Sequence, residues 1–165
     1  MIFVIMLLVA LVFSSIGFKK YVWFISLGYG FSVAAIGVTQ LILFRQNLSA
    51  GTVCACAVMI LYGLRLGGYL AFRELKSSSY NSKMKTEIKS GEGMKFGVKC
   101  AIWISAALLY AAQTSPVTFR LENAAEDDVL LFVGIGISVV GLIIESLADF
   151  QKNAAKKINP RRFVD

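Results

Sequence analysis

The sequence predicts an all-α protein embedded in a membrane, and three observations carry this prediction. Of the 165 residues, 57% are hydrophobic and the mean hydropathy is +0.69, whereas soluble domains are roughly 45–50% apolar. Five apolar stretches approach the length of about 20 residues that a helix needs to cross a bilayer. None shows the alternating pattern of an outer-membrane barrel, so their backbone polar groups should pair within helices.

The predicted integral membrane bundle has about five transmembrane helices. They run from Met1 to Phe18, Tyr21 to Phe44, Leu48 to Phe72, Phe96 to Val117 and Val129 to Phe150. The first stretch lacks a basic start and a small-residue cleavage site, so we interpret it as a retained helix rather than a signal peptide. We expect residues 1–165 to form a single membrane domain, with a polar cytosolic loop at 74–95 and a basic cytosolic tail at 151–165.

Basic residues predict how the spans are oriented. The chain has 17 Lys and Arg against 10 Asp and Glu, and the basic residues gather at Lys19 and Lys20, in the loop at 74–95 and in the tail. The connection after the fourth span is acidic, and the one after the second has only Arg45. The positive-inside rule then places the N-terminus outside and the C-terminus in the cytosol. We expect an integral protein of the endoplasmic reticulum if eukaryotic, or of the inner membrane if bacterial, and no nucleic-acid partner.

Several classes of site are excluded by composition. The chain has no histidine, which removes the commonest general base, any Ser-His arrangement and HExxH-type metal binding. There is no P-loop and no GxGxxG motif after a strand. We therefore expect no metal site, and a nucleotide would have to be held in another way.

A first polar cluster lies inside the third span. In LYGLRLGGYLAFRE, the residues Tyr62, Arg65, Tyr69 and Arg73 are spaced so that they share one face of a helix. Snorkelling at the cytosolic end accounts for Arg73 and Tyr69, but Arg65 lies roughly 12 Å deeper. A charge at that depth indicates either an anionic ligand or an internal carboxylate partner for Arg65.

A second polar cluster lies in GLIIESLADFQK. Glu145, Asp149, Lys152 and Lys156 form a single stripe along the helix, acids first and bases after. One interpretation is an ion pair between Arg65 and Glu145 or Asp149, since the third and fifth spans both end on the cytosolic side. The other is that the stripe binds a ligand, and the periodicity leaves both open.

Three segments resemble the steroid 5-alpha-reductase family. LYGLRLGGYLAFR is similar to that family's third helix, AAQTSPV to its Gln-then-Ser-Pro-Val segment, and GLIIESLADFQK followed by INPRRFVD to its Glu-x-x-Ala-Asp-x-Gln-Lys signature. The resemblance implies a helical membrane enzyme that uses NADPH to reduce a carbon–carbon double bond conjugated to a carbonyl. It also implies a sterol-like or other lipid substrate and contact with membrane lipids.

The resemblance gives the polar residues roles. Tyr62 would polarise the substrate carbonyl as enolate charge develops. Glu145 and Asp149 would accept hydrogen bonds from the nucleotide, Lys156 would meet its phosphate, and Arg65 would neutralise the acids or touch the cofactor. The family's carbonyl-binding glutamate in an earlier helix has no counterpart, and Gln40 is the comparable polar side chain of the second span.

The family's sequences continue past the position of Asp165 into a segment that completes the cofactor site. This difference implies an incomplete enzyme without turnover of its own. The alternative is a non-catalytic membrane scaffold or interaction protein derived from the family. A transporter that uses the acids and Arg65 as an ion relay ranks last, because the chain has no internal repeat.

Overall fold

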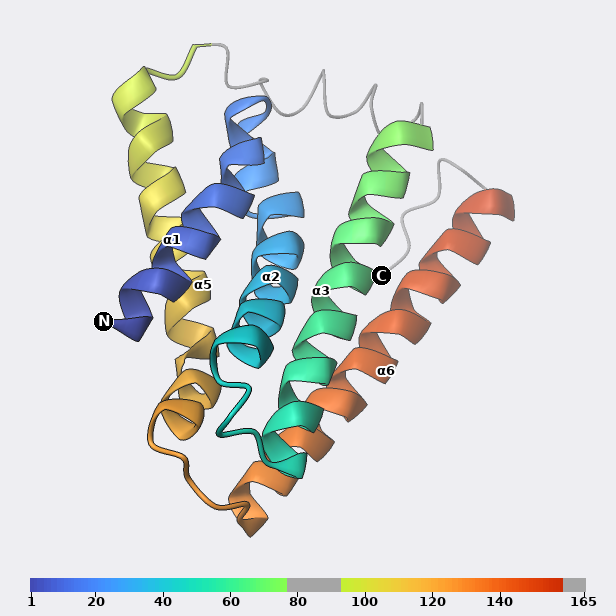
Figure 1. The fold of residues 1–165 in the computed structure, drawn as a ribbon. Coiled ribbons are helices and arrows are strands. Elements are labelled where there is room, and N and C mark those ends of the chain that lie inside the picture. The colour runs from blue at the N-terminus through green and yellow to red at the C-terminus, as the bar shows by residue number, and fades with distance from the viewer. Residues whose placement is uncertain (77–92, 159–165) are drawn as a thin grey trace. The chain divides into compact units, whose positions relative to one another are not determined.

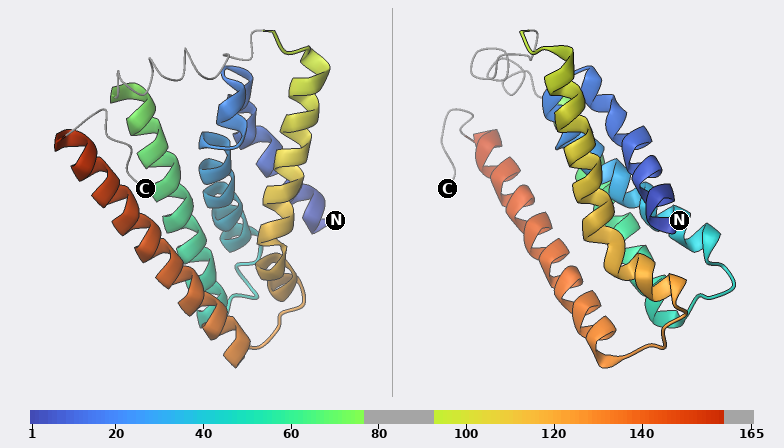
Figure 2. Two further views of the ribbon diagram at one scale, coloured as in Figure 1. Left: turned by 180° about the vertical axis from the view of Figure 1, so that it is seen from behind. Right: turned by 90° about the vertical axis from the view of Figure 1, so that its left-hand side faces the viewer.

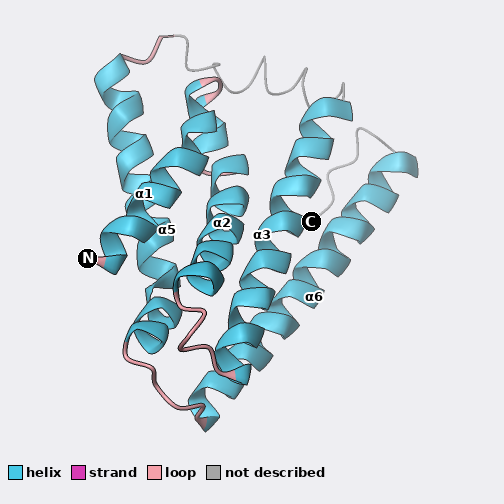
Figure 3. Cartoon of the chain, viewed as in Figure 1, coloured by secondary structure: helices cyan, strands magenta, loops and turns pink. Residues whose placement is uncertain are grey.

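The chain folds into α-helices in a computed structural model that describes residues 1–76 and 93–158 (Figure 1). Short loops join the helices, and these residues contain no strand (Figure 3). The predicted all-α class is therefore confirmed. Most of the predicted loop at 74–95, and residues 159–165 of the predicted tail, lie outside the described residues.

The helices belong to two compact units, each described here by itself: Met1–Asp127 (unit 1) and Asp128–Asp165 (unit 2). Unit 1 contains α1 (Ile2–Ser14), the 3₁₀ turns η1 (Ser15–Phe18) and η2 (Tyr21–Phe24), α2 (Leu27–Leu43), α3 (Ala50–Lys76) and α5 (Phe96–Glu122), and unit 2 contains α6 (Val129–Ile158). Four segments are long and apolar enough to cross a membrane: Tyr21–Leu43, Ala50–Arg73, Phe96–Glu122 and Val129–Ala155.

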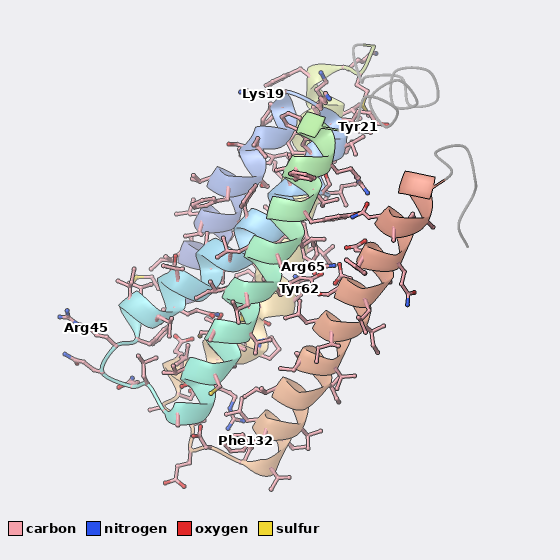
Figure 4. The ribbon with its side chains drawn as sticks, turned by 90° about the vertical axis from the view of Figure 1, so that its right-hand side faces the viewer. Lys19, Tyr21, Arg45, Tyr62, Arg65 and Phe132 are labelled. Atoms are coloured by element: carbon pink, nitrogen blue, oxygen red, sulfur yellow. The ribbon has the colours of Figure 1, made fainter. Side chains whose placement is uncertain are left out.

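Within unit 1, α2 lies beside both α1 and α3, and α5 packs against α1 and α2 (Figures 1 and 2). Consecutive helices run in opposite directions. Lys19 consequently lies at one end of the unit and Arg45 at the other (Figure 4), which is the separation that the predicted orientation requires. The core contains the buried side chains Met6, Ala10, Ile36, Cys56, Tyr110 and Leu121.

The first predicted span, Met1 to Phe18, is an apolar helix over Ile2–Phe18, which is shorter than the four membrane-length segments. The α-helical part of α1 has 13 residues, which is about 20 Å of rise against a hydrocarbon core of about 30 Å. Its end tightens into η1, where the Ser14 hydroxyl bonds to the Ala10 carbonyl and the Ser15 hydroxyl to the Val12 carbonyl, each at 2.6 Å. Such bonds compete with the regular helical pattern, which explains why the helix changes pitch here.

The second predicted span is broken after η2, before α2 begins at Leu27. A break inside lipid frees backbone groups that have no water to bind. The Tyr110 hydroxyl on α5 donates to the Phe24 carbonyl at 2.7 Å, and the Ser26 hydroxyl donates to the Val22 carbonyl at 3.0 Å. Side chains thus bind two carbonyls of η2, just before the break.

Glycines allow α2 and α3 to touch through their backbones. A Cβ atom added to Gly30 would come within 2.6 Å of the Gly67 nitrogen and 2.8 Å of the Gly63 carbonyl oxygen. One added to Gly63 would clash with the Gly30 carbonyl and lie 2.6 Å from the Ala34 nitrogen. Gly30 and Gly67 thus allow the two helix backbones to approach closely, whereas Gly68 has nothing within 4 Å of its added Cβ.

Helix α5 continues through Pro116 and ends at Glu122, five residues beyond the predicted end of the fourth span at Val117. Proline cannot donate to the carbonyl four residues before it, here that of Ala112. The hydroxyl of Ser115 donates to this carbonyl at 2.7 Å instead. The Ser115 hydroxyl therefore replaces the backbone hydrogen bond that Pro116 cannot make, and α5 continues to Glu122.

Side chains cap the two helices that start nearest the acidic connection. Ser49 and Thr52 cap α3 reciprocally: the Thr52 amide donates to the Ser49 hydroxyl at 3.1 Å, and the Ser49 amide donates to the Thr52 hydroxyl at 2.9 Å. In unit 2, Asp128 precedes α6 and accepts from the amide of Leu131 at 2.8 Å. Helix α6 then extends to Ile158, so the predicted tail begins as helix.

Candidate functional site

Three tyrosines from three helices form a cluster inside unit 1, the phenol cluster: Tyr29 on α2, Tyr62 on α3 and Tyr110 on α5. The Tyr62 hydroxyl donates to the Tyr29 hydroxyl at 3.2 Å. The Tyr29 ring packs edge-on to the Tyr62 ring, with centroids 5.8 Å apart, and against the Tyr110 ring at 5.2 Å. Such ring pairs stabilise a contact beyond the apolar area they bury.

Tyr110 anchors the cluster. Only 2% of its surface is exposed, and its hydroxyl is committed to the Phe24 carbonyl at the break before α2. Tyr29 and Tyr62 are partly buried. The cluster therefore has one structural hydroxyl, that of Tyr110, and one pair of phenols whose hydroxyls bind each other.

Arg65 lies one helical turn beyond Tyr62 on α3 (Figure 4). Its guanidinium carbon lies 5.8 Å from the centre of the Tyr69 ring, and that of Arg73 lies 5.9 Å from the same ring. Both guanidinium groups thus lie within cation–π range of the Tyr69 ring, on the helix face predicted from sequence. Cation–π contacts of this kind hold guanidinium groups in place without neutralising their charge.

The acidic stripe on α6 belongs to unit 2. Because α6 is continuous from Val129 to Ile158, Glu145, Asp149 and Lys152 fall on one face, as their spacing predicted. The side chain of Lys156 lies outside the described part of the chain. The predicted pairing of Arg65 with Glu145 or Asp149 would join the two units, and it stays a prediction.

Gln40 is part of a buried hydrogen-bonded chain that the sequence did not predict. Its side chain has no exposed surface. The Cys56 thiol on α3 donates to Gln40 Oε1 at 3.5 Å, and Gln40 Nε2 donates to Thr118 Oγ1 at 2.8 Å. The Thr118 hydroxyl in turn donates to the Thr114 carbonyl at 3.2 Å. Gln40 is thus occupied in joining α2, α3 and α5.

Tyr29 is the site residue that sequence reasoning missed. It stands between Gly28 and Gly30 in α2. An added Cβ at Gly28 would lie 2.9 Å from the Trp23 carbonyl, and one at Gly30 would lie 2.6 Å from the Gly67 nitrogen. A polar aromatic residue flanked by two close-contact glycines within a span is the signal that identifies it.

Comparison with known proteins places the whole chain in one family. No curated protein and no solved structure matches it. Residues 8–162 match the family described as "Protein of unknown function (DUF1295)". Because this match covers nearly the full sequence, the chain belongs to the DUF1295 family.

Proposed function

We propose that this protein is an NADPH-dependent membrane reductase that acts on a carbon–carbon double bond conjugated to a carbonyl in a lipid or sterol-like substrate. The resemblance of its polar segments to the steroid 5-alpha-reductase family motivates the proposal. The observation that carries it is the pair of hydrogen-bonded phenols, Tyr62 and Tyr29, inside a bundle of membrane-spanning helices.

The chemistry needs a hydrogen-bond donor that is fixed before the substrate arrives. As the double bond is reduced, negative charge develops on the carbonyl oxygen, and a donor aimed at that oxygen stabilises the charge in the transition state. A phenol is neutral and can be kept among apolar helices. Exclusion of water there strengthens the hydrogen bond it gives.

The residues present fit a nicotinamide nucleotide by their chemistry. Glu145 and Asp149 supply carboxylate acceptors for ribose hydroxyls and the carboxamide, and Lys152 extends the same face of α6 with a cation suited to phosphate. NADPH would supply the two electrons of the reduction. Arg65 is the candidate to balance the acids or to contact the nucleotide.

The test is reduction of an enone by protein expressed from its complete gene and reconstituted in nanodiscs. Cholestenone, a sterol enone, and decenone, a linear one, serve as probes, with NADPH oxidation followed by absorbance and the product by mass spectrometry. The double variant Tyr29→Phe/Tyr62→Phe keeps both rings, and we expect it to lower kcat by about 10²- to 10³-fold. Asp149→Asn should instead act mainly on cofactor binding and raise the KM for NADPH.

Tyr21→Phe is the matched control, because Tyr21 lies at one end of unit 1 and outside the phenol cluster (Figure 4). It removes a phenol hydroxyl and should leave both constants unchanged. Folded protein that oxidises no NADPH with either probe would overturn the reductase proposal. That result would favour the alternative of a non-catalytic membrane scaffold.

A further inference from the structure

We propose that unit 1 binds one anionic phospholipid, with an acyl chain in an apolar groove between α1, α2 and α3 and the headgroup phosphate at the lysines that follow α1. The groove and the lysines carry this proposal together. It does not depend on the reductase proposal, because none of the residues involved belongs to the phenol cluster or to the stripe on α6.

The groove lies on the surface of unit 1, where α2 runs between α1 and α3 (Figure 1). Its volume is about 310 Å³, near the lower end of the range of about 300–1,000 Å³ that ligand pockets cover. The walls come from three helices and include Phe13, Phe31, Ala35, Val38, Ile60 and Leu64. Phe13, Val38 and Leu64 are 47%, 43% and 54% exposed, so the groove opens at the surface of the unit.

The lining of the groove suits hydrocarbon. Thr39 is the one polar residue among the described residues that line it, and its hydroxyl already donates to the Ala35 carbonyl at 2.8 Å. A bound group is therefore held by apolar contacts with the aromatic and branched walls. An acyl chain needs no other partner, whereas a carbonyl oxygen bound here would find no donor in the lining.

The groove is on the opposite side of α2 from the phenol cluster. Phe31 follows Tyr29 by two residues, which turns it by about 200° around the helix, and Val38 returns to the side of Phe31 seven residues later. The Tyr29 ring packs against Tyr110 of α5, whereas the Phe31 ring lies beside α3, 3.1 Å from a Cβ added to Gly67. The lipid site and the candidate reductase site are therefore separate.

Three lysines gather at one end of unit 1. Lys19 and Lys20 are exposed and lie between η1 and η2. The Phe18 ring stacks on the Phe96 ring of α5 with centroids 6.0 Å apart, which brings the exposed Lys95 to the same end. The Lys20 ammonium also lies 5.2 Å from the centre of the Trp23 ring, and tryptophan is enriched where a helix meets the headgroups.

The groove and the lysines are placed as the two parts of a phospholipid require. Phe13 precedes Lys19 by six residues, so this wall begins less than about two helical turns from the lysines. From Phe31 to Thr39 the groove follows α2 for about 12 Å of helix rise. The lysines lie on the predicted cytosolic side, where anionic lipids are found and each lysine near the surface favours their binding.

Native mass spectrometry of detergent-solubilised protein, expressed from its complete gene, tests the proposal. Phosphatidylglycerol and phosphatidylcholine with the same acyl chains are titrated in turn, and the lipid-bound fraction gives each Kd. We expect one bound phosphatidylglycerol, held at least about 5-fold more tightly than phosphatidylcholine, since one lysine near a headgroup contributes about this factor. Lys19→Gln/Lys20→Gln should remove the preference. Arg45→Gln is the matched control, because Arg45 lies at the opposite end of unit 1 (Figure 4).

A second variant tests the groove itself. Ala35→Phe fills it and should weaken binding of both lipids at least about 10-fold, because the loss of two buried methylenes already costs this much. Ala101→Phe is the matched control, since Ala101 is exposed on α5 and does not line the groove. The melting temperature of lipid-free protein shows that each variant is folded. If Ala35→Phe does not fold, the lysine variant at exposed positions still decides the outcome.

Four results would overturn the proposal. Equal affinity of the wild type for the two lipids, or an equal loss in Arg45→Gln, would show that the lysines form no headgroup site. Unchanged binding in Ala35→Phe would place the chain outside the groove. Displacement of the lipid by glycerophosphoglycerol, its deacylated form, would show that the headgroup alone is recognised. A dimer that dissociates in Ala35→Phe would show that a second copy of the chain covers the groove.

Discussion

Gln40 Nε2 on α2 donates a hydrogen bond of 2.8 Å to Thr118 Oγ1 on α5, and both side chains are almost completely buried. Thr118→Val keeps the shape of the side chain and removes this acceptor. We expect the free energy of unfolding to fall by about 1 kcal/mol, because Gln40 is left with an unpaired N–H inside the bundle. Unfolding in mixed detergent–SDS micelles measures the change.

The double variant Gln40→Leu/Thr118→Val provides the internal control. It removes both partners, so no unpaired amide remains in the interior and the loss should be smaller than the sum of the two single losses. Strictly additive losses would show that the two side chains do not stabilise each other.

Gly63 and Gly68 lie on the same helix, but only Gly63 packs closely against another helix. Gly63→Ala would push a methyl group against the Gly30 carbonyl and the Ala34 nitrogen, both parts of the α2 backbone. We expect it to lower the free energy of unfolding by about 1–3 kcal/mol. It should also reduce ligand binding, since Tyr62 lies next to Gly63 and would be displaced from Tyr29.

Gly68→Ala is the matched control. Its added Cβ meets nothing within 4 Å, so only helix propensity changes, and alanine is favoured there by about 0.5–1 kcal/mol. The variant should be at least as stable as the wild type. A loss in Gly68→Ala equal to that in Gly63→Ala would contradict the close approach at Gly63.

The membrane-spanning character was predictable because apolar length is a local property of the sequence. Four of the five predicted spans correspond to segments long enough to cross a membrane. The first has the predicted bounds, as the shorter apolar helix Ile2–Phe18, but hydropathy does not register the change of pitch at Ser14 and Ser15. Helix ends depend on such side-chain bonds to the backbone, which a hydropathy pattern does not contain.

The candidate site was only partly predictable, for a different reason. The α3 face of Tyr62, Arg65, Tyr69 and Arg73 follows from spacing within one helix, and the structure retains it. The partner of Tyr62 lies 33 positions away in sequence, and no periodicity relates residues of different helices. Only the packing of α2 on α3 reveals that Tyr29 is that partner.

A Ser115 variant tests whether the Ser115 hydroxyl stabilises α5 next to Pro116. Ser115→Ala leaves the Ala112 carbonyl without a donor next to Pro116, and an unpaired carbonyl in lipid is unfavourable. We expect a loss of about 1 kcal/mol in the free energy of unfolding. The double variant Ser115→Ala/Pro116→Ala should recover part of it, because alanine restores the backbone N–H. No recovery would mean that Ser115 acts in another way.

Asp127 links the acidic connection to the start of α3. Its carboxylate accepts from the Ser49 hydroxyl at 2.5 Å and from the backbone N–H of Gly51 at 2.9 Å. The first N–H groups of a helix have no partner within it, and a negative charge there is favoured by the helix dipole. The side chain therefore acts as a second cap on the helix that carries Tyr62.

Asp127→Ala should loosen the first turn of α3 and lower the free energy of unfolding by about 1 kcal/mol, combining the lost cap with the lost charge at the helix terminus. Hydrogen exchange measured by mass spectrometry should show faster exchange of the Gly51 amide, while the amides around Tyr62 keep their protection. Glu126→Ala removes the same charge from the adjacent position, where the residue is exposed, and should leave both readouts unchanged. Equal effects in the two variants would show that net charge, rather than the hydrogen bond to Gly51, stabilises this end of the helix.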